Sequence, residues 1–210
     1  MSESLEAFTR RARACRICVE RPIGPPLPHE PRPVLLPSSQ ARILIASQAP
    51  GTKVHLSGMP FTDASGDRLR NWLGVTRDEF YDLRNFAIVP MGFCFPGQDA
   101  KGGDLPPRRE CAPAWRAPLM DRMPQIELVL TIGLYAQAWH MGETRRGSLT
   151  ETVMNWREIF AGPSRPTVLP LPHPSWRNTG WVKKNPWFEM DLLPFLKTET
   201  RSRMGEIARK

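Results

Sequence analysis

"SQAPGTKVHLSGMPF", residues 47–61, is the stretch of sequence that decides the fold. A turn of small residues, Gln48-Ala49-Pro50-Gly51, directly follows an apolar run at residues 41–46, and Phe61 stands ten residues further on, between two polar or turn-forming neighbours. In parallel sheets, ligands bind beyond the carboxyl ends of the strands. If residues 41–46 form a buried strand, the turn that follows them lies where a ligand would bind.

The rest of the chain repeats this alternation of apolar runs and helical patterns. Further strands are predicted at residues 86–91, 128–132 and 167–171, and helices at residues 66–73, 107–123 and 135–141. Strands that alternate with helices indicate βαβ units and a parallel sheet covered on both faces. We therefore expect an α/β fold: a single-domain, three-layer sandwich over residues 1–210 with a central, mainly parallel four-stranded sheet. Residues 1–14 and 198–210 are expected to be peripheral.

Composition bounds the class of protein. A chain of 210 residues with 40% hydrophobic residues is long and apolar enough for one full core. Its apolar runs are too short to span a bilayer, and the first fifteen residues lack the apolar core of a signal peptide, so a cytoplasmic protein without a membrane partner is expected. The net charge of +8 favours a polyanionic partner, although a solvated basic surface explains it equally well.

Four cysteines form the second signal. Cys15 and Cys18 stand in "CRIC", and Cys94 and Cys111 follow far along the chain. A CxxC pair with two distant partners is a metal-ligand pattern, because thiolates at this spacing can face one ion or cluster. Structural disulfides are disfavoured without a secretion signal. Inert free cysteines are the alternative, and spacing alone does not separate zinc from an iron–sulfur cluster.

Six short motifs, taken together, resemble the uracil-DNA glycosylase superfamily. They are "CRIC", "SQAPG", "SGMPF", "FCFPG", "RREC" and "LPHPSW", in the order and at the separations of the iron–sulfur branch called family 4, from about Cys15 to Leu196. "GMPFTDASGD" is also similar to the type-B branch, family 5. The resemblance implies a structural [4Fe–4S] cluster on Cys15, Cys18, Cys94 and Cys111, in preference to zinc, a monomer, and a DNA partner that contains uracil or other damaged bases.

The resemblance also implies roles for residues of a base pocket. Glycosylases flip the target base out of the duplex, and small residues let the backbone approach it closely. The pocket floor is assigned to Ser47, Gln48, Ala49, Pro50 and Gly51. Phe61 matches the residue that stacks on the base, with a plain core aromatic as the alternative. His173 in "LPHPSW" matches the catalytic histidine, whose imidazole stabilises charge on the departing base; the alternative is a turn cap.

The residues after this histidine are assigned to DNA. Ser175 is expected to contact a phosphate, while Trp176 and Arg177 probe the minor groove and fill the vacated stack. The basic residues Lys101, Arg108 and Arg109 between two of the cysteines would grip phosphate or form a solvated loop.

Two departures from the family pattern affect the chemistry. The carboxylates that orient the attacking water in families 1 and 4 are replaced by Ala49 and Gln48. Asp63 is the nearest substitute, with Asp67 as the fallback, although either could cap a helix, and a water held by backbone alone is a further alternative. Pro90 stands where the family usually has the asparagine that reads uracil. Because rejecting an analogue requires a group that the wrong base leaves unpaired, Pro90 predicts relaxed specificity.

The sequence therefore predicts a monofunctional DNA glycosylase of base excision repair, which hydrolyses the N-glycosidic bond of uracil and of other deaminated bases. Two alternatives remain open. One is a catalytically silent damaged-DNA-binding protein of the same fold, and the other is a zinc-stabilised hydrolase of free nucleosides.

Overall fold

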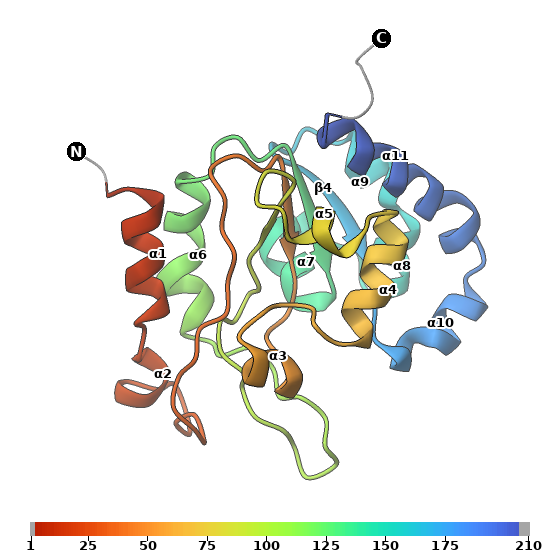
Figure 1. The fold of residues 1–210 in the computed structure, drawn as a ribbon. Helices are drawn as coiled ribbons and strands as arrows, with labels where there is room; N and C mark the ends of the chain where they lie inside the picture. Colours follow the sequence, from red (N-terminus) through yellow and green to blue (C-terminus); the bar gives the residue numbers. More distant parts are fainter. Residues whose placement is uncertain (1–2, 206–210) are drawn as a thin grey trace.

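The protein, described here by a computed structural model over residues 3–205, is built on one parallel sheet (Figure 1). Within these residues the sheet has four strands in the order β2-β1-β3-β4. They are β1 (Ile43–Ala46), β2 (Phe86–Ile88), β3 (Leu128–Ile132) and β4 (Thr167–Leu171). In the register, Ile43 of β1 lies opposite Phe86 of β2 and Leu128 of β3. The predicted α/β class and the four-stranded parallel sheet are confirmed.

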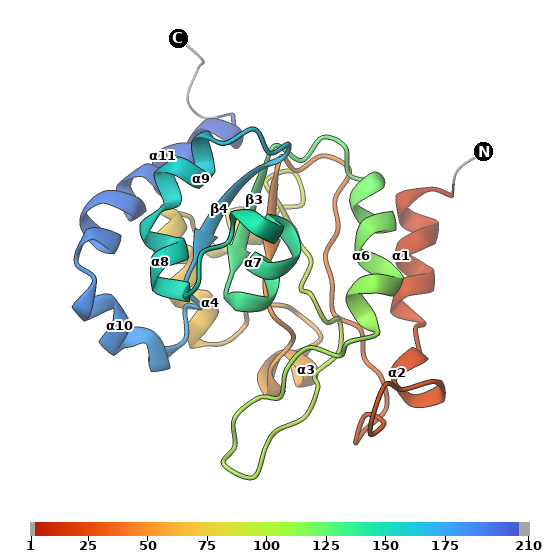
Figure 2. The ribbon, with the colours of Figure 1, turned by 180° about the vertical axis from the view of Figure 1, so that it is seen from behind.

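Helices cover both faces of the sheet because both faces of β1 are apolar. Ile43 and Ile45 point into a core shared with α4 (Ala64–Leu73) and α11 (Leu193–Arg203), whereas Leu44 and Ala46 point into a second core. That second core includes α1 (Leu5–Arg13), α6 (Cys111–Asp121) and α7 (Leu134–Met141), which Figure 2 shows from behind. Alternate strand residues point to opposite faces, so a continuous apolar strand needs two covering layers.

Shorter helices connect these layers. They are α2 (Ile17–Glu20), α3 (Thr52–Ser57), α5 (Arg77–Tyr81), α8 (Leu149–Met154), α9 (Trp156–Ala161) and α10 (Thr179–Lys184), with 3-10 turns at Gly142–Thr144 and Trp176–Asn178 and a π-helical turn at Phe188–Leu192. Thr76 and Ser148 begin α5 and α8 as capping boxes, each with a glutamate three residues later. None of the helices in the described part of the chain is long and apolar enough to cross a membrane.

Some predicted boundaries are wrong. The strand predicted at 86–91 ends at Ile88, although the N–H groups of Val89 and Met91 still donate to the carbonyls of Ile45 and Ser47. The helix predicted at 107–123 begins at Cys111, after two prolines. In the segment 1–14, predicted to be peripheral, α1 packs against α6 through the buried side chains of Phe8 and Ala12. At the other end Thr200 of α11 is buried as well; residues 1–2 and 206–210 lie outside the described residues.

Candidate active-site cleft and cysteine centre

A cleft of about 550 Å³ lies at the carboxyl edge of the sheet. The segments that follow β1, β2 and β4 supply its walls, as expected where a doubly wound sheet reverses its strand order. The structure brings together here the residues that the sequence assigned to base and DNA. The lining includes Ser47, Gln48, Ala49, Pro50, Gly51, Phe61, Asp63, Pro90, His173, Ser175, Trp176 and Arg177.

The turn after β1 is held by backbone hydrogen bonds to the segment after β2. The Ser47 carbonyl accepts from the Met91 N–H at 2.8 Å, and the Gln48 carbonyl accepts from the Gly92 N–H at 2.9 Å. Gly51 ends the turn as the N-cap of α3. Because both carbonyls are engaged, the floor of the cleft is fixed before any ligand enters.

Phe61 is held in an unusual backbone conformation beside the cleft. Its φ of 57° lies in the left-handed region that side chains other than glycine rarely adopt. The Phe61 carbonyl accepts hydrogen bonds from Arg70 Nη1 at 3.2 Å and from the Tyr81 hydroxyl at 3.0 Å. A Cβ on Gly66 would lie only 1.8 Å from that carbonyl oxygen. The ring is 7% exposed and packs edge-on against Phe80, so Phe61 is both a core residue and a wall of the cleft.

His173 is positioned by its own loop. Its Nδ1 accepts the Ser175 N–H at 3.2 Å, and its carbonyl accepts from the Asn178 side chain at 2.7 Å. Burial lowers the pKa of His173, opposed in part by the carboxylates of Asp63 and Asp104. A neutral imidazole whose Nδ1 accepts must carry its proton on Nε2. The ring is therefore a donor at Nε2.

The loop that follows presents a tryptophan to solvent. Trp176 is 73% exposed, and the Arg177 guanidinium lies 5.8 Å from the centre of its ring. Arg68 of α4 anchors this loop: its guanidinium donates to the Ser175 carbonyl and to Thr179 Oγ1, each at 3.0 Å. The sequence analysis missed Arg68, since nothing in its spacing links it to a loop more than 100 residues away.

The side chains of Asp63 and Asp67 both make contacts within the first turns of α4. Asp63 is the N-cap, and its Oδ1 accepts the Gly66 N–H at 3.2 Å. Asp67 pairs with Arg70 at 2.6 Å. Of the two, Asp63 also lines the cleft.

A fully buried arginine, also missed in the sequence, lies behind the cleft. Arg116 of α6 is 1% exposed, and its Nη1 donates to the carbonyls of Val89 and Pro90 at 2.9 and 3.1 Å. Its Nη2 and Nε lie 2.6 and 2.9 Å from His140 Nε2. Burial and the adjacent guanidinium lower the pKa of His140, which is therefore a neutral acceptor here.

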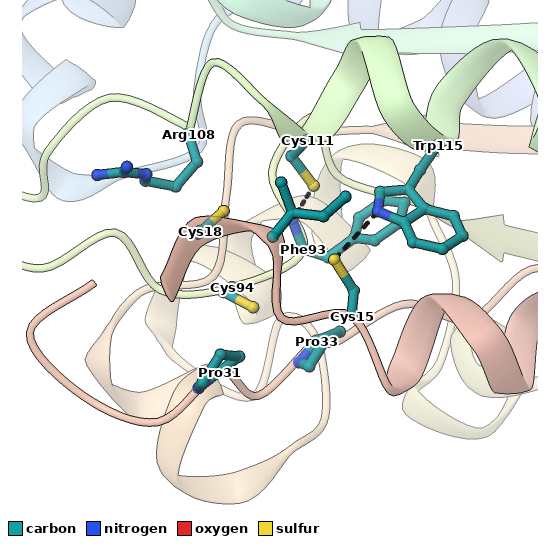
Figure 3. A pocket seen from close by; sticks show the side chains of 10 residues that line it. Cys15, Cys18, Pro31, Pro33, Phe93, Cys94, Arg108, Cys111 and Trp115 are labelled. Atoms are coloured by element: carbon teal, nitrogen blue, oxygen red, sulfur yellow. Dashed lines mark hydrogen bonds between the residues drawn. The ribbon is translucent and has the colours of Figure 1, made fainter. Parts of the chain in front are cut away.

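The four cysteines line one small cavity, as Figure 3 shows, together with Phe93 and Trp115. They come from four places in the chain: the end of α1, α2, the loop after β2 and the start of α6. The set consists of Cys15, Cys18, Cys94 and Cys111, and all four are free thiols. The Trp115 ring N–H donates to Cys15 Sγ at 3.2 Å, and the Phe93 N–H donates to Cys111 Sγ at 3.3 Å.

The donor set suits a metal that prefers sulfur. N–H donors directed at sulfur are the contacts that tune thiolate-bound clusters. Burial raises the pKa of Cys94 to about 12, so the free thiol is protonated and a metal would have to stabilise the thiolate. Within residues 3–205, no three His, Cys, Asp or Glu side chains are arranged as ligands of a single metal ion. Arg108, for which the sequence left phosphate or a solvated loop open, binds Glu110 and the Pro25 carbonyl beside this cavity.

Comparison with known families identifies the protein class. Residues 33–197 match the family model described as the uracil DNA glycosylase superfamily. The match covers most of the chain, from the segment before β1 to α11, and includes the entire cleft. The protein belongs to the uracil DNA glycosylase superfamily. Membership makes it a DNA glycosylase-type hydrolase of DNA repair, whose family acts on DNA with damaged bases.

Proposed function

We propose that the protein is a monofunctional glycosylase that removes uracil, and other deaminated bases, from DNA. The observation that carries this proposal is the state of His173. Its Nδ1 is occupied by the Ser175 N–H, so its Nε2–H is the free donor of the ring, in a cleft that Phe61 also lines. A donor in a partly desolvated cleft stabilises negative charge far better than one in water.

The chemistry follows from what each wall offers. A flipped base enters between the fixed turn 47–51 and Phe61, whose ring supplies a stacking surface worth about 1–3 kcal/mol. As the glycosidic bond lengthens, negative charge accumulates on the base and the sugar becomes cationic. The Nε2–H of His173 donates to a carbonyl oxygen of the base and stabilises that charge. The reaction needs no redox step, because water alone completes it.

The attacking water needs an orienting group. Asp63, the candidate from the sequence, lines the cleft. One of its oxygens is engaged as the cap of α4, and the other makes no hydrogen bond within residues 3–205.

DNA would be bound by the loop after His173. Trp176 is exposed enough to enter a groove or fill the space left by the flipped base, which offsets part of the cost of unstacking. Arg177 is exposed beside it, and Ser175 offers a hydroxyl toward a phosphate. Arg68 keeps the loop in place, so less ordering is needed on binding.

The four cysteines are proposed to hold a [4Fe–4S] cluster with a structural role. Such a cluster would join α1, α2, the loop after β2 and α6, which otherwise meet through few backbone hydrogen bonds. Purification without oxygen should yield about four irons and four sulfides per chain. Cys94→Ser is expected to lower the iron content and the melting temperature together. Zinc in place of iron in protein purified under iron-replete conditions would contradict the cluster assignment.

A glycosylase assay tests the proposed function directly. Labelled oligonucleotides with uracil, hypoxanthine or xanthine are incubated with the wild type, with His173→Ala, and with His29→Gln, which changes a histidine outside the cleft lining. We expect abasic sites from the wild type and His29→Gln, and a loss of about 10²–10³-fold in His173→Ala. Binding without cleavage of any lesion would favour the silent DNA-binding alternative. Cleavage of uracil alone would contradict the relaxed specificity expected from Pro90.

A further inference from the structure

The turn that lacks the family's carboxylate faces a carboxylate from another loop. Gln48 and Ala49 cannot orient water as a carboxylate would, yet Asp104 lines the same cleft. Its Oδ2 lies 3.1 Å from the position that a Cβ on Gly51 would occupy. Asp104 thus reaches the turn 47–51 from the segment between Cys94 and Cys111, more than 50 residues further along the chain.

The loop that carries Asp104 is ordered by its own hydrogen bonds. The backbones of Gln98 and Asp104 form an antiparallel bridge. The Asp99 side chain accepts the N–H groups of Lys101 and Gly103 at 2.8 and 2.9 Å. Figure 1 shows this loop extending beside α3. These hydrogen bonds order the loop as a hairpin, and Asp104 lies on that hairpin.

One neighbouring side chain forms a hydrogen bond with the carboxylate of Asp104. Gln98 Nε2 donates to its Oδ1 at 3.2 Å. The Oδ2 atom, which lies over Gly51, makes no hydrogen bond within the described part of the chain. Asp104, Asp63 and His173 all line the cleft, and the charge of each carboxylate raises the pKa of the imidazole against the larger effect of burial.

We propose that Asp104 is the catalytic residue that positions the attacking water and takes its proton. This inference rests on the proposed glycosylase function. The water oxygen bonds to C1′ of the sugar as the bond from C1′ to the base nitrogen breaks. The bonding electron pair leaves with the base, one water proton passes to the Asp104 carboxylate, and the base anion, held by His173, takes a proton from solvent.

Asp104 is better suited to this role than Asp63. One oxygen of Asp63 is committed to the Gly66 N–H at the start of α4, where it stabilises the helix. Asp104 caps no helix and is exposed, so the fold does not depend on its charge. Its free oxygen stands over the turn whose family counterparts supply the carboxylate.

Single-turnover cleavage of a uracil oligonucleotide tests the assignment with three matched variants. Asp104→Asn is expected to slow cleavage by about 10²–10⁴-fold, the range for loss of a general base. Its Kd for an oligonucleotide with non-cleavable 2′-fluorinated deoxyuridine should be unchanged. Asp63→Asn keeps a good helix cap and tests the other carboxylate of the cleft; its loss of rate should be the smaller of the two. Asp121→Asn, on the exposed end of α6, controls for the loss of one negative charge.

A double-mutant cycle separates a direct role from a general effect on the loop. Gly51→Ala would push its Cβ toward Asp104 Oδ2, so its effect on rate should be much smaller when Asp104 is already asparagine. Wild-type rates in Asp104→Asn, or a loss in Asp63→Asn alone, would overturn this inference and leave the glycosylase intact. A wild-type protein inactive on every lesion would overturn both proposals.

Discussion

Replacing Gly66 by alanine should destabilise the protein, although alanine is normally the better helix residue. The added Cβ would lie 1.8 Å from the Phe61 oxygen, 2.6 Å from its carbonyl carbon and 2.9 Å from its Cβ. Two of these are backbone atoms, so the Phe61 segment must move. That movement breaks the hydrogen bonds from Arg70 and Tyr81, each worth about 1 kcal/mol, and adds overpacking of about 1–3 kcal/mol.

The higher helix propensity of alanine offsets about 1 kcal/mol of this cost. The net decrease in the free energy of unfolding should therefore be about 2–4 kcal/mol. For a chain of this size that corresponds to a fall in Tm of roughly 5–15 °C. Urea denaturation measures the loss, and Gly180→Ala in α10 is the matched control. No atom lies within 4 Å of the Cβ position at Gly180, so that variant should be as stable as the wild type or more so. Unchanged stability in Gly66→Ala would refute the close-approach argument.

Three further predictions concern the cleft. Because burial holds the pKa of His173 below 6.5, the unfolded chain binds its proton first as the pH falls. Urea midpoints measured from pH 7.5 to 5 should therefore decline below pH 6.5, and decline less in His173→Gln. Arg68→Ala frees the loop that carries Trp176, and we expect weaker DNA binding, by about tenfold for the loss of 1.4 kcal/mol, with a smaller change in the cleavage step. Pro90→Asn places a side-chain amide on the cleft wall, and competition between uracil and hypoxanthine oligonucleotides should then favour uracil by at least about tenfold. An unchanged ratio would show that another group reads the base.

The sequence predicted the sheet because its strands are continuous apolar runs. A run such as residues 128–132 is apolar at every position, so the strand it forms must be buried on both faces. The turn that follows β1 must then lie at the carboxyl edge of the sheet. The motifs also placed Phe61 and His173 in one cleft, more than 100 residues apart in the chain. Each of these inferences rests on local pattern and on the rule that parallel strands end at one edge.

The missed residues act through tertiary contacts that leave no local pattern. Arg116 stands in a helix with a proline and apolar neighbours, and only the folded chain shows that it contacts two carbonyls just after β2 and the ring of His140. The sequence assigns Arg108 to phosphate or to a solvated loop, because it lies in the basic segment between two of the cysteines. Its pairing with Glu110 and its position beside the cysteine cavity depend on how that loop returns to α6. For Asp63 the sequence left a catalytic role and a helix cap as alternatives; the geometry shows the cap, and the catalytic role stays a prediction.

The hydrogen bond from Arg116 to the Pro90 carbonyl affects which groups this wall of the cleft can offer to a bound molecule. Proline has no N–H, and its carbonyl is already bound by a guanidinium from behind. The backbone of Pro90 therefore offers the cleft no donor, and its carbonyl already accepts one hydrogen bond. Under the proposed function, this wall would select a base by its shape and thickness, and lesions that differ only in the order of their donors and acceptors would be equivalent there. In the proposed glycosylase, replacing the single residue Pro90 would be enough to give this wall a hydrogen-bonding group.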